Sequence, residues 1–403
     1  MNKFMLVLSI FYGAIFIHVG FFMPFFSVWL ESIKLNSLEI SIILATPLFM
    51  RVIFTPIISF ISDRSGNHVR TIQFLAWGTL FSLSLLFVAN GFLQILIISA
   101  IFSIFWTSVM PLAEAIAMKG VRNEGLDYGR MRLWGSLTFI CASSFGGIIL
   151  AKYGPSSALW LFAIAALTVL CASYTLSSVS PGNGNGEQSS AEPVQVKHLF
   201  EICRSPVFLF FLIGASTIQA SHAVLYGFGS IHWKAQGISE GVIGVLWAIG
   251  VIAETVLFAF SSRVVGIVGA ANLLLLGAGA GVIRWTIMAF DPSMAVLFPL
   301  QVLHGLTFGA GHLGAIILIG NLVPERYSAT AQGLYAALSM GFIMGLAMLA
   351  SGPLYDLLSG GAYLPMAGVS LLSLITLVIF IRLWDEKHIA LDQGKQSRLS
   401  TAK

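Results

Sequence analysis

Five ionisable side chains lie near the middle of long apolar stretches of this sequence, namely Glu114, Arg132, Glu254, Arg284 and His304. A charge at the centre of a bilayer costs about 2.5–3.5 kcal/mol even on lenient insertion scales. A membrane protein that keeps several such groups is expected to use them to line a polar pathway. These residue types therefore predict a transporter, in which charged side chains bind a polar solute and a proton.

Glu114 and Arg132 are expected at one depth on neighbouring helices. Glu114 precedes Arg122 by eight residues, and Arg132 follows Asp127 by five. At 1.5 Å per residue, both come to about 8–12 Å from the same membrane boundary. Pairing there would offset much of the cost of removing the two charges from water. Two interpretations stay open, a structural ion pair and a substrate-binding pair that faces a central cavity.

Glu254, Arg284 and His304 fall on three consecutive apolar stretches. Low dielectric favours the neutral form of a carboxyl group, whereas a nearby guanidinium favours its charged form. A change in the distance from Glu254 to Arg284 would therefore change proton affinity, which is what proton coupling requires. His304 is of the residue type that relays or senses such a proton. The alternative is a buried polar network that only fixes helix packing.

Further side chains in the apolar stretches are candidates for substrate contact. They are His18, Arg51, Trp134, Gln219, His222, Tyr226 and His312. A lone histidine on an apolar helix is more often a hydrogen-bonded packing residue, so each histidine keeps that alternative. Arginines outnumber glutamates among the intramembrane charges, which favours an anionic substrate over a cation.

The composition excludes a water-soluble fold. The chain has 403 residues, of which 57% are hydrophobic and only 9% charged, and its mean hydropathy is +0.90. Soluble domains carry about 25% charged residues. The stretches are too continuous for barrel strands, so we expect an all-α membrane protein with twelve transmembrane helices. The expected spans are 4–30, 39–61, 70–89, 92–118, 130–151, 156–176, 206–232, 238–261, 267–289, 293–321, 328–351 and 361–383.

The distribution of the 21 basic residues predicts the orientation. With both termini in the cytoplasm, the opposite side holds only Lys34, Lys152 and Lys234, as the positive-inside rule requires. The net charge of +4 thus reports topology in the inner (plasma) membrane, and nothing supports nucleic-acid binding. The first stretch continues for over 25 residues, so we interpret it as a retained span and not a signal peptide.

No sequence pattern indicates an enzyme. HExxH, P-loop and GxSxG motifs are absent from the sequence. Its three cysteines are scattered, which suggests neither disulfides nor a metal site. We therefore expect no cofactor, and as partners only a small-molecule substrate, a proton and membrane lipid, with the chain acting as a monomer.

One long polar segment divides the chain. Residues 177–205 contain Pro181-Gly-Asn-Gly-Asn-Gly186, a composition typical of flexible linkers. It separates an N-terminal six-helix half, residues 1–176, from a C-terminal six-helix half, residues 206–384. A cytoplasmic tail, residues 385–403, follows.

Two residues that recur at a constant offset support a division into two pseudo-symmetric halves. His18 and Trp29 in the first expected span recur as His222 and Trp233 in the seventh, both at an offset of 204. Transporters with parallel repeats are organised in this way.

Asp63-Arg64-Ser65-Gly66, between the second and third spans, resembles the loop signature of the major facilitator superfamily. Ser59 stands where that pattern prefers glycine, and Asn67-His68 replaces its basic pair. The resemblance implies the major facilitator fold, with Asp63 and Arg64 in a latch on the cytoplasmic side. Helix capping together with positive-inside charge is the alternative.

Four segments resemble the phenylpropionic-acid transporter subfamily, and the likeness extends over essentially the whole chain. They are Asp127–Ser136, Gln219–Phe228, Val282–Trp285 and Gln301–His304. The resemblance implies transport of an aromatic monocarboxylate such as 3-phenylpropionate.

A more distant resemblance is to the lactose permease group of oligosaccharide:proton symporters. In that group an acid on span four and an arginine on span five bind sugar, and Glu114 and Arg132 match with the same eighteen-residue spacing. Glu254, Arg284 and His304 likewise fall on the group's coupling acid, arginine and histidine.

Three departures from that group argue against galactoside transport. Thr307 stands where the group has a second coupling acid, Met340 where it has a lysine, and Phe139 where it has a sugar-stacking tryptophan. Glu254 or a histidine is then left to carry the proton.

Our hypothesis is proton-coupled uptake of a small organic solute by alternating access. Arg132 and Arg51 would hold a carboxylate, Trp134 and Tyr226 would pack an aromatic ring, and Glu114 would orient Arg132. Two alternatives remain open, a proton symporter of a sugar or nucleoside and a membrane sensor that transports nothing.

Overall fold

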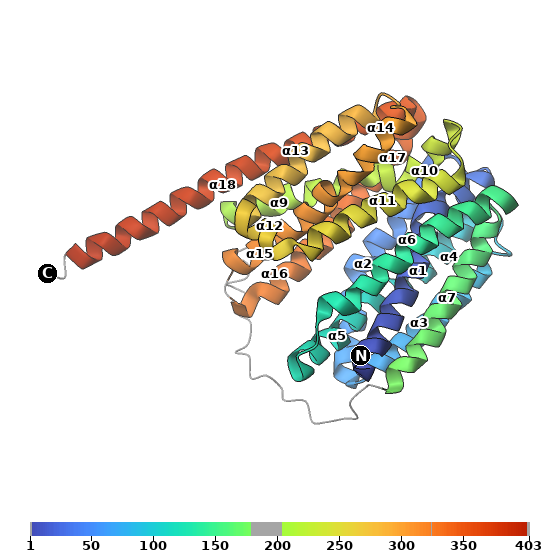
Figure 1. Ribbon diagram of the computed structural model, residues 1–403, viewed down its shortest axis with the longest axis horizontal. Coiled ribbons are helices and arrows are strands. Elements are labelled where there is room, and N and C mark those ends of the chain that lie inside the picture. Colours follow the sequence, from blue (N-terminus) through green and yellow to red (C-terminus); the bar gives the residue numbers. More distant parts are fainter. Residues whose placement is uncertain (1, 179–203, 324, 401–403) are drawn as a thin grey trace.

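The computed structural model describes residues 2–178, 204–323 and 325–400, with only the backbone considered at 122–124, 325–330 and 385–400. Every regular element within these ranges is a helix (Figure 1). The expectation of an all-helical chain is therefore confirmed for the part that the structure describes.

The first part of the chain forms seven α-helices and a closing 3-10 turn. They are α1 (Lys3–Ser32), α2 (Ser37–Ser65), α3 (His68–Leu85), α4 (Phe92–Trp106), α5 (Val109–Glu124), α6 (Tyr128–Tyr153), α7 (Ser157–Thr175) and η1 (Leu176–Ser178).

The second part contains α-helices interrupted by π-helical and 3-10 segments. They are α9 (Pro206–Ala220), α10 (Ala223–Ala235), α11 (Glu240–Ala259), α12 (Ser261–Val268), α13 (Ala270–Met288), α14 (Met294–Val302), η2 (Gly305–Ala310), α15 (Gly311–Leu322), α16 (Glu325–Ala337), η3 (Leu338–Ile343), α17 (Met344–Leu358), η4 (Ser359–Ala362) and α18 (Tyr363–Ser400).

Ten helical segments of the described chain are long and apolar enough to cross a membrane. One of them, Ala331–Trp384, has 54 residues and contains two of the expected spans, 328–351 and 361–383. The expected span 70–89 corresponds to α3, which has 18 residues and is not among the ten. The chain is therefore a multi-pass membrane protein, and eleven of its twelve expected spans correspond to these ten segments.

Local caps explain where several helices begin and end. The Asn36 side chain accepts from the backbone N–H of Glu39 at 3.0 Å, and the Glu39 carboxylate accepts from the N–H of Asn36 at 3.0 Å, which forms a capping box for α2. At the other end of α2, Gly66 adopts φ +65°, a left-handed conformation that glycine tolerates without strain. Asp127 caps α6 by accepting from the N–H of Arg130 at 3.1 Å.

The side chains form three apolar clusters. One lies wholly between Phe4 and Leu176, and another wholly between Phe208 and Phe380. The third draws on both parts of the chain and includes Phe25, Trp233 and Trp285. Each part thus has a core of its own, and a shared core joins them.

The two parts meet closely where α6 packs against α11, and these helices run side by side in Figure 1. A side chain on Gly147 would clash with the backbone carbonyl of Glu240, and one on Gly244 with that of Ser143. The missing side chains therefore allow the two backbones to touch. A second junction joins α2 to α17, where the Ser37 hydroxyl donates to the Asp356 carboxylate at 2.8 Å.

Of the expected linker 177–205, residues 179–203 lie outside the described residues. Helix α18 runs past the expected end of the last span at 383 as far as Ser400 and projects from the body of the molecule (Figure 1). The boundary at 384/385 is thus no helix end.

Candidate functional site

Glycines bring the middle of α11 against the junction of α14 and η2. A Cβ atom on Gly250 would lie 3.3 Å from the His304 side chain, and one on Gly305 would lie 3.0 Å from the backbone of Ala253. Because Glu254 follows Ala253 directly, this close approach places its carboxylate beside the His304 ring. Segment η2 is π-helical. This form is rare overall, and where it occurs it is often at a functional site.

The three residues expected to exchange a proton lie together in the order Glu254, His304, Arg284. His304 Nε2 lies 3.9 Å from the Glu254 carboxylate, and His304 Nδ1 lies 3.3 Å from Arg284 Nη1. Arg284 is fully buried, and the Glu254 side chain is 18% exposed. In the described chain no ion pair joins Glu254 to Arg284, because the histidine ring stands between them.

This geometry determines the tautomer of His304. A guanidinium carries only donors, so Arg284 Nη1 donates to His304 Nδ1, which must be the unprotonated ring nitrogen. The ring proton of neutral His304 therefore sits on Nε2, the nitrogen that faces the Glu254 carboxylate. A second proton on Nδ1 would set two donors against each other, so the Arg284 contact favours neutral His304.

Arg284 holds two further residues that the sequence reasoning did not include among the candidates. Its Nη2 donates to Gln301 Oε1 at 2.8 Å, and its Nη1 donates to Thr307 Oγ1 at 3.0 Å. Thr307 Oγ1 lies 3.0 Å from His222 Nε2, so the hydroxyl can donate onward to that ring. Both residues could have been found as polar side chains inside an otherwise apolar stretch next to His304.

His222, which lies between α9 and α10, completes this hydrogen-bond network. Its Nδ1 lies 3.2 Å from the carbonyl oxygens of Ile218 and Gln219, and it donates its ring proton there. The ring stacks on Tyr226 at 5.4 Å and meets Trp285 edge-on at 5.1 Å. The predicted candidates His222 and Tyr226 therefore lie together beside the Arg284 network.

Glu114 and Arg132 are neighbours, but the structure does not form the expected ion pair between them. The Tyr128 hydroxyl donates to Glu114 Oε1 at 2.9 Å. The Arg132 guanidinium lies over the Phe16 ring, 3.9 Å from its centroid. Tyr128 and Arg132 are four residues apart and share one face of α6, so the tyrosine reaches the carboxylate in place of the arginine. Tyr128 was not predicted as a site residue.

The charge of Arg132 links the two parts of the chain. It is close enough to Glu254 on α11 and to His312 on α15 to act on both electrostatically. The packing of α6 against α11 produces this proximity. The two constellations, expected separately from the sequence, therefore lie within electrostatic range of each other.

Gln219 and His312 belong to a second polar group, between α9, α15 and α16. Gln219 is fully buried, and neither polar atom of its amide has a hydrogen-bond partner among the described residues. The Tyr335 hydroxyl lies beside Gln219 and Ser339, and the Tyr335 ring lies 6.4 Å from His312. Tyr335 and Ser339 were not predicted.

His18 lies apart from the charged residues, in an aromatic cluster of the first part. Its ring is buried and packs on Trp106 at 4.2 Å, Phe22 at 5.4 Å and Phe102 at 5.9 Å. Neither ring nitrogen has a hydrogen-bond partner within the described ranges. This position agrees better with the packing alternative than with contact to a polar solute.

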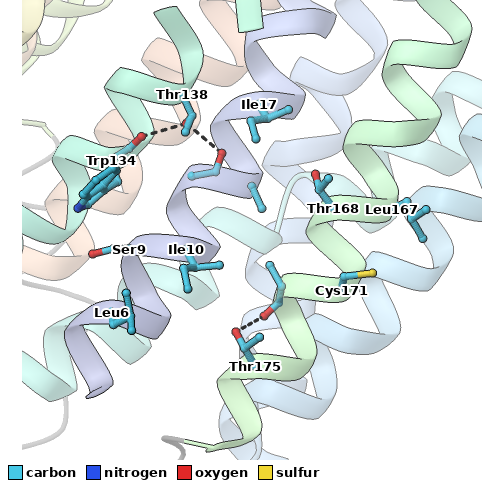
Figure 2. A pocket seen from close by; sticks show the side chains of 13 residues that line it. Leu6, Ser9, Ile10, Ile17, Trp134, Thr138, Leu167, Thr168, Cys171 and Thr175 are labelled. Carbon is cyan, nitrogen blue, oxygen red and sulfur yellow. Dashed lines mark hydrogen bonds between the residues drawn. The ribbon is translucent and has the colours of Figure 1, made fainter. Parts of the chain in front are cut away.

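Trp134 and Arg51 also lie away from the Arg284 network. Trp134 is 47% exposed and lines a groove on the outside of the molecule, between α1, α6 and α7 (Figure 2). It is two residues from Arg132, so the two side chains point about 200° apart on the helix. Arg51 is half-buried on α2, and in the described part of the chain no ion pair or side-chain hydrogen bond involves it.

The two predicted gate residues lie at the end of α2. The Asp63 side chain is 70% exposed and lies 3.7 Å from His68 Nε2. The Asp63 carbonyl accepts from the N–H of Gly66 at 3.1 Å, which closes the helix. Arg64 is exposed beside it. These contacts are those of helix capping.

The chain belongs to the MFS_1 like family, whose family model matches residues 5–364. It is 29% identical to the probable 3-phenylpropionic acid transporter of Escherichia coli (strain K12), over 90% of this chain and 94% of that protein. It is 25% identical to the maltose permease of Geobacillus stearothermophilus, over 93% and 94% of the two chains. The resemblance to the major facilitator superfamily is thus confirmed.

The fold is also similar to that of a solved transporter. The crystal structure of nucleoside transporter NupG superimposes with a TM-score of 0.79, at 16% identity, over 94% of this chain and 99% of that one. The relatives are named permeases and transporters. The chain is therefore a secondary transporter of the major facilitator type, and not an enzyme.

Proposed function

We propose that this protein couples the uptake of a small organic monocarboxylate to the entry of a proton, with an aromatic acid such as 3-phenylpropionate as the favoured substrate. The observation that carries the proposal is the row Glu254–His304–Arg284, in which a largely buried carboxylate faces a histidine held neutral by an arginine. The similarity to a probable 3-phenylpropionic acid transporter supports the substrate class.

In this proposal Glu254 carries the proton. It is the one member of the row that can gain a proton without placing donors against each other, since Arg284 occupies His304 Nδ1. Arg132 lies in electrostatic range of Glu254. When a substrate carboxylate neutralises Arg132, the charged form of Glu254 is stabilised less by the guanidinium. Glu254 then binds a proton more tightly. Substrate and proton are then bound together, as symport requires.

Arg132 is the proposed anchor for the substrate carboxylate. A guanidinium offers a planar pair of donors that matches a carboxylate, and Glu114 accepts from Tyr128 and not from Arg132. Glu114 would thus position the Tyr128–Arg132 face of α6. Tyr226, half-buried beside His222, would pack the aromatic ring, and Gln219, His312 and Arg51 would complete the polar lining.

The architecture proposed for this cycle has twelve spans in two halves, residues 1–176 and 206–384. Both termini and the linker 177–205 would lie in the cytoplasm, with the chain a monomer in the inner membrane. The segment Ala331–Trp384 supports the count, since at 1.5 Å per residue 54 residues extend about 80 Å, more than two crossings of a ~30 Å core. Asp63 and Arg64 would latch the cytoplasmic side in alternating access.

The test is uptake of labelled 3-phenylpropionate into vesicles that contain the purified protein, with and without an inward proton gradient. We expect accumulation only with the gradient, and competition by other aromatic monocarboxylates. In parallel, Arg132→Lys should raise KM more than it lowers the maximal rate, because it keeps the charge but loses the paired donors. Accumulation without a gradient would contradict the proposal of symport.

A second candidate is proton symport of a sugar or nucleoside. The similarity to a maltose permease supports it. The same vesicles distinguish the two, because neutral sugars or nucleosides would then compete for uptake while aromatic acids would have no effect.

A further inference from the structure

A groove runs along the outside of the first part of the chain, with α1 as its floor and α6 and α7 as its walls (Figure 2). Its volume is about 630 Å³. Trp134 and Thr138 line the α6 wall, and Leu167 and Thr168 line the α7 wall. None of the charged residues of the candidate site lines this groove, so the proposed transport function does not use it.

The groove offers nothing that a polar solute would require. The Thr138 hydroxyl donates to the Gly13 carbonyl at 2.9 Å, and the Thr168 hydroxyl donates to the Ala165 carbonyl at 2.6 Å. Ser9 and Thr175 likewise donate to backbone carbonyls of their own helices. Because each of these hydroxyls is already satisfied by the backbone, the lining is chemically apolar and fits a hydrocarbon chain.

The length of the groove matches one leaflet of a membrane. Along α1 it extends from Leu6 to Ile17, which at 1.5 Å per residue is about 16 Å. The hydrocarbon core of a bilayer is about 30 Å thick, so one leaflet contributes about 15 Å. A chain lying in the groove would therefore run from the headgroup region to the middle of the bilayer.

Basic side chains stand at the headgroup end of the groove. Lys3 lies three residues before Leu6 and Arg130 four residues before Trp134, so each shares a helix face with a groove residue. The Arg130 side chain is 77% exposed, and its one ion pair within the described residues is with the exposed Asp127, at 3.3 Å. An exposed pair of this kind contributes little, which leaves the guanidinium free to turn to an anion. Trp134 has the amphipathic ring typical of this depth.

We propose that this groove binds one anionic glycerophospholipid, with an acyl chain along α1 and the phosphate of its headgroup at Lys3 and Arg130. The apolar lining, the length of one leaflet and the pair of cations at one end together select this occupant. The site is a lipid site on the outside of the transporter, distinct from the substrate path.

The experiment is native mass spectrometry of the full chain in detergent, with added phosphatidylglycerol or phosphatidylcholine of identical acyl chains. We expect one retained phosphatidylglycerol and weaker retention of phosphatidylcholine. The double variant Lys3→Gln/Arg130→Gln changes only exposed side chains and should reduce phosphatidylglycerol affinity by about fivefold for each residue. Its phosphatidylcholine binding should change less, because the choline cation offsets the charge of the phosphate.

A second variant fills the groove. Thr168→Trp should abolish the retained lipid, whereas Ile283→Trp, which places the same bulk on the exposed face of α13, should not. Equal retention of the two lipids by the unaltered protein would overturn the proposal. So would unchanged retention in Thr168→Trp, or a dimer in place of a lipid adduct, since a second copy of the chain would then occupy the groove.

Discussion

His304 occupies the central position in the buried row of charges, because it separates the Arg284 guanidinium from the Glu254 carboxylate. Its Nδ1 accepts from Arg284 and its Nε2 faces Glu254. A residue in this position can orient both neighbours without changing its own charge. We therefore propose that His304 positions Glu254 and Arg284, and that the transported proton is carried by the carboxylate.

A non-titrating substitute tests this role of His304. Asparagine can accept from Arg284 with its amide oxygen and is never protonated, so His304→Asn should keep proton-driven accumulation within about an order of magnitude. His304→Ala should lose more, because it leaves a buried guanidinium donor unpaired at a cost of about 1–3 kcal/mol. Uptake under a fixed proton gradient compares the two variants. Loss of all coupling in His304→Asn, with substrate exchange intact, would assign the proton to the histidine.

Substitution of Thr307 should change the stability of the protein, which can be measured independently of transport. Its hydroxyl accepts from Arg284 and faces His222 Nε2. Thr307→Val keeps the shape but leaves two buried polar groups without this partner, and we expect a loss of about 1–3 kcal/mol in the free energy of unfolding. Thr307→Ser keeps the hydroxyl and serves as the control. Thermal unfolding of the purified variants measures the difference, and equal values for the two would show that the hydroxyl contributes nothing.

The sequence placed Glu254, Arg284 and His304 on three successive spans, although depth alone did not place Arg284 level with Glu254. The structure brings the three together, with His304 between the other two. Of the two interpretations of Glu114 and Arg132, the structural ion pair is not formed, because depth says nothing about which side chain of α6 reaches the carboxylate first. Tyr128 reaches it at 2.9 Å. Rotation about the helix axis likewise placed Trp134 on the outer surface.

At the scale of elements, the crossing of α6 and α11 is the feature that depends most on side-chain size. Gly147 and Gly244 each face a backbone carbonyl of the opposite helix so closely that no side chain fits. Small residues let membrane helices approach when lipid supplies no hydrophobic drive between them. This junction is therefore closed in the structure, and α6 and α11 must separate if the transporter is to open at this end.

Gly244→Ala should separate α6 from α11 and favour the form that is open at this end. The added methyl group meets the Ser143 carbonyl, which belongs to rigid backbone, and overpacking of this kind costs about 1–3 kcal/mol. Spin labels at the exposed Ser156 and Ser239, one on each side of the crossing, should show a longer distance by pulsed electron paramagnetic resonance. Gly279→Ala is the matched control, since nothing lies within 4 Å of its added carbon. An unchanged distance in Gly244→Ala would contradict this account of the crossing.

Hydropathy located most helices but not their irregular parts. The expected spans fall on observed helices because about 20 apolar residues must form a helix to satisfy their backbone in lipid. The π-helical segments η2 and η3 were not predicted, because a change to i→i+5 hydrogen bonding does not alter the hydropathy of an apolar stretch. Helix α12, with eight residues, is too short to register as a span.

At the scale of the whole molecule, the proposed coupling depends on a charge that acts between the two parts of the chain. Arg132, in the part before residue 179, acts on Glu254 in the part after residue 203. A rocking motion about the α6–α11 crossing would change their separation and so link proton affinity to the state of the transporter. Substrate and proton would then be exchanged on the same side of the membrane.

The most direct test measures substrate and proton flux together in vesicles, for the unaltered protein and for Glu254→Gln. The account predicts that 3-phenylpropionate entry carries protons with it in the unaltered protein. In Glu254→Gln, substrate exchange should persist while net accumulation and proton entry are lost. Glu240→Gln, at the far end of the same helix and paired with Lys234 at 3.0 Å, should leave coupling intact. Proton entry that continues with substrate in Glu254→Gln would contradict the central claim that this carboxylate carries the proton.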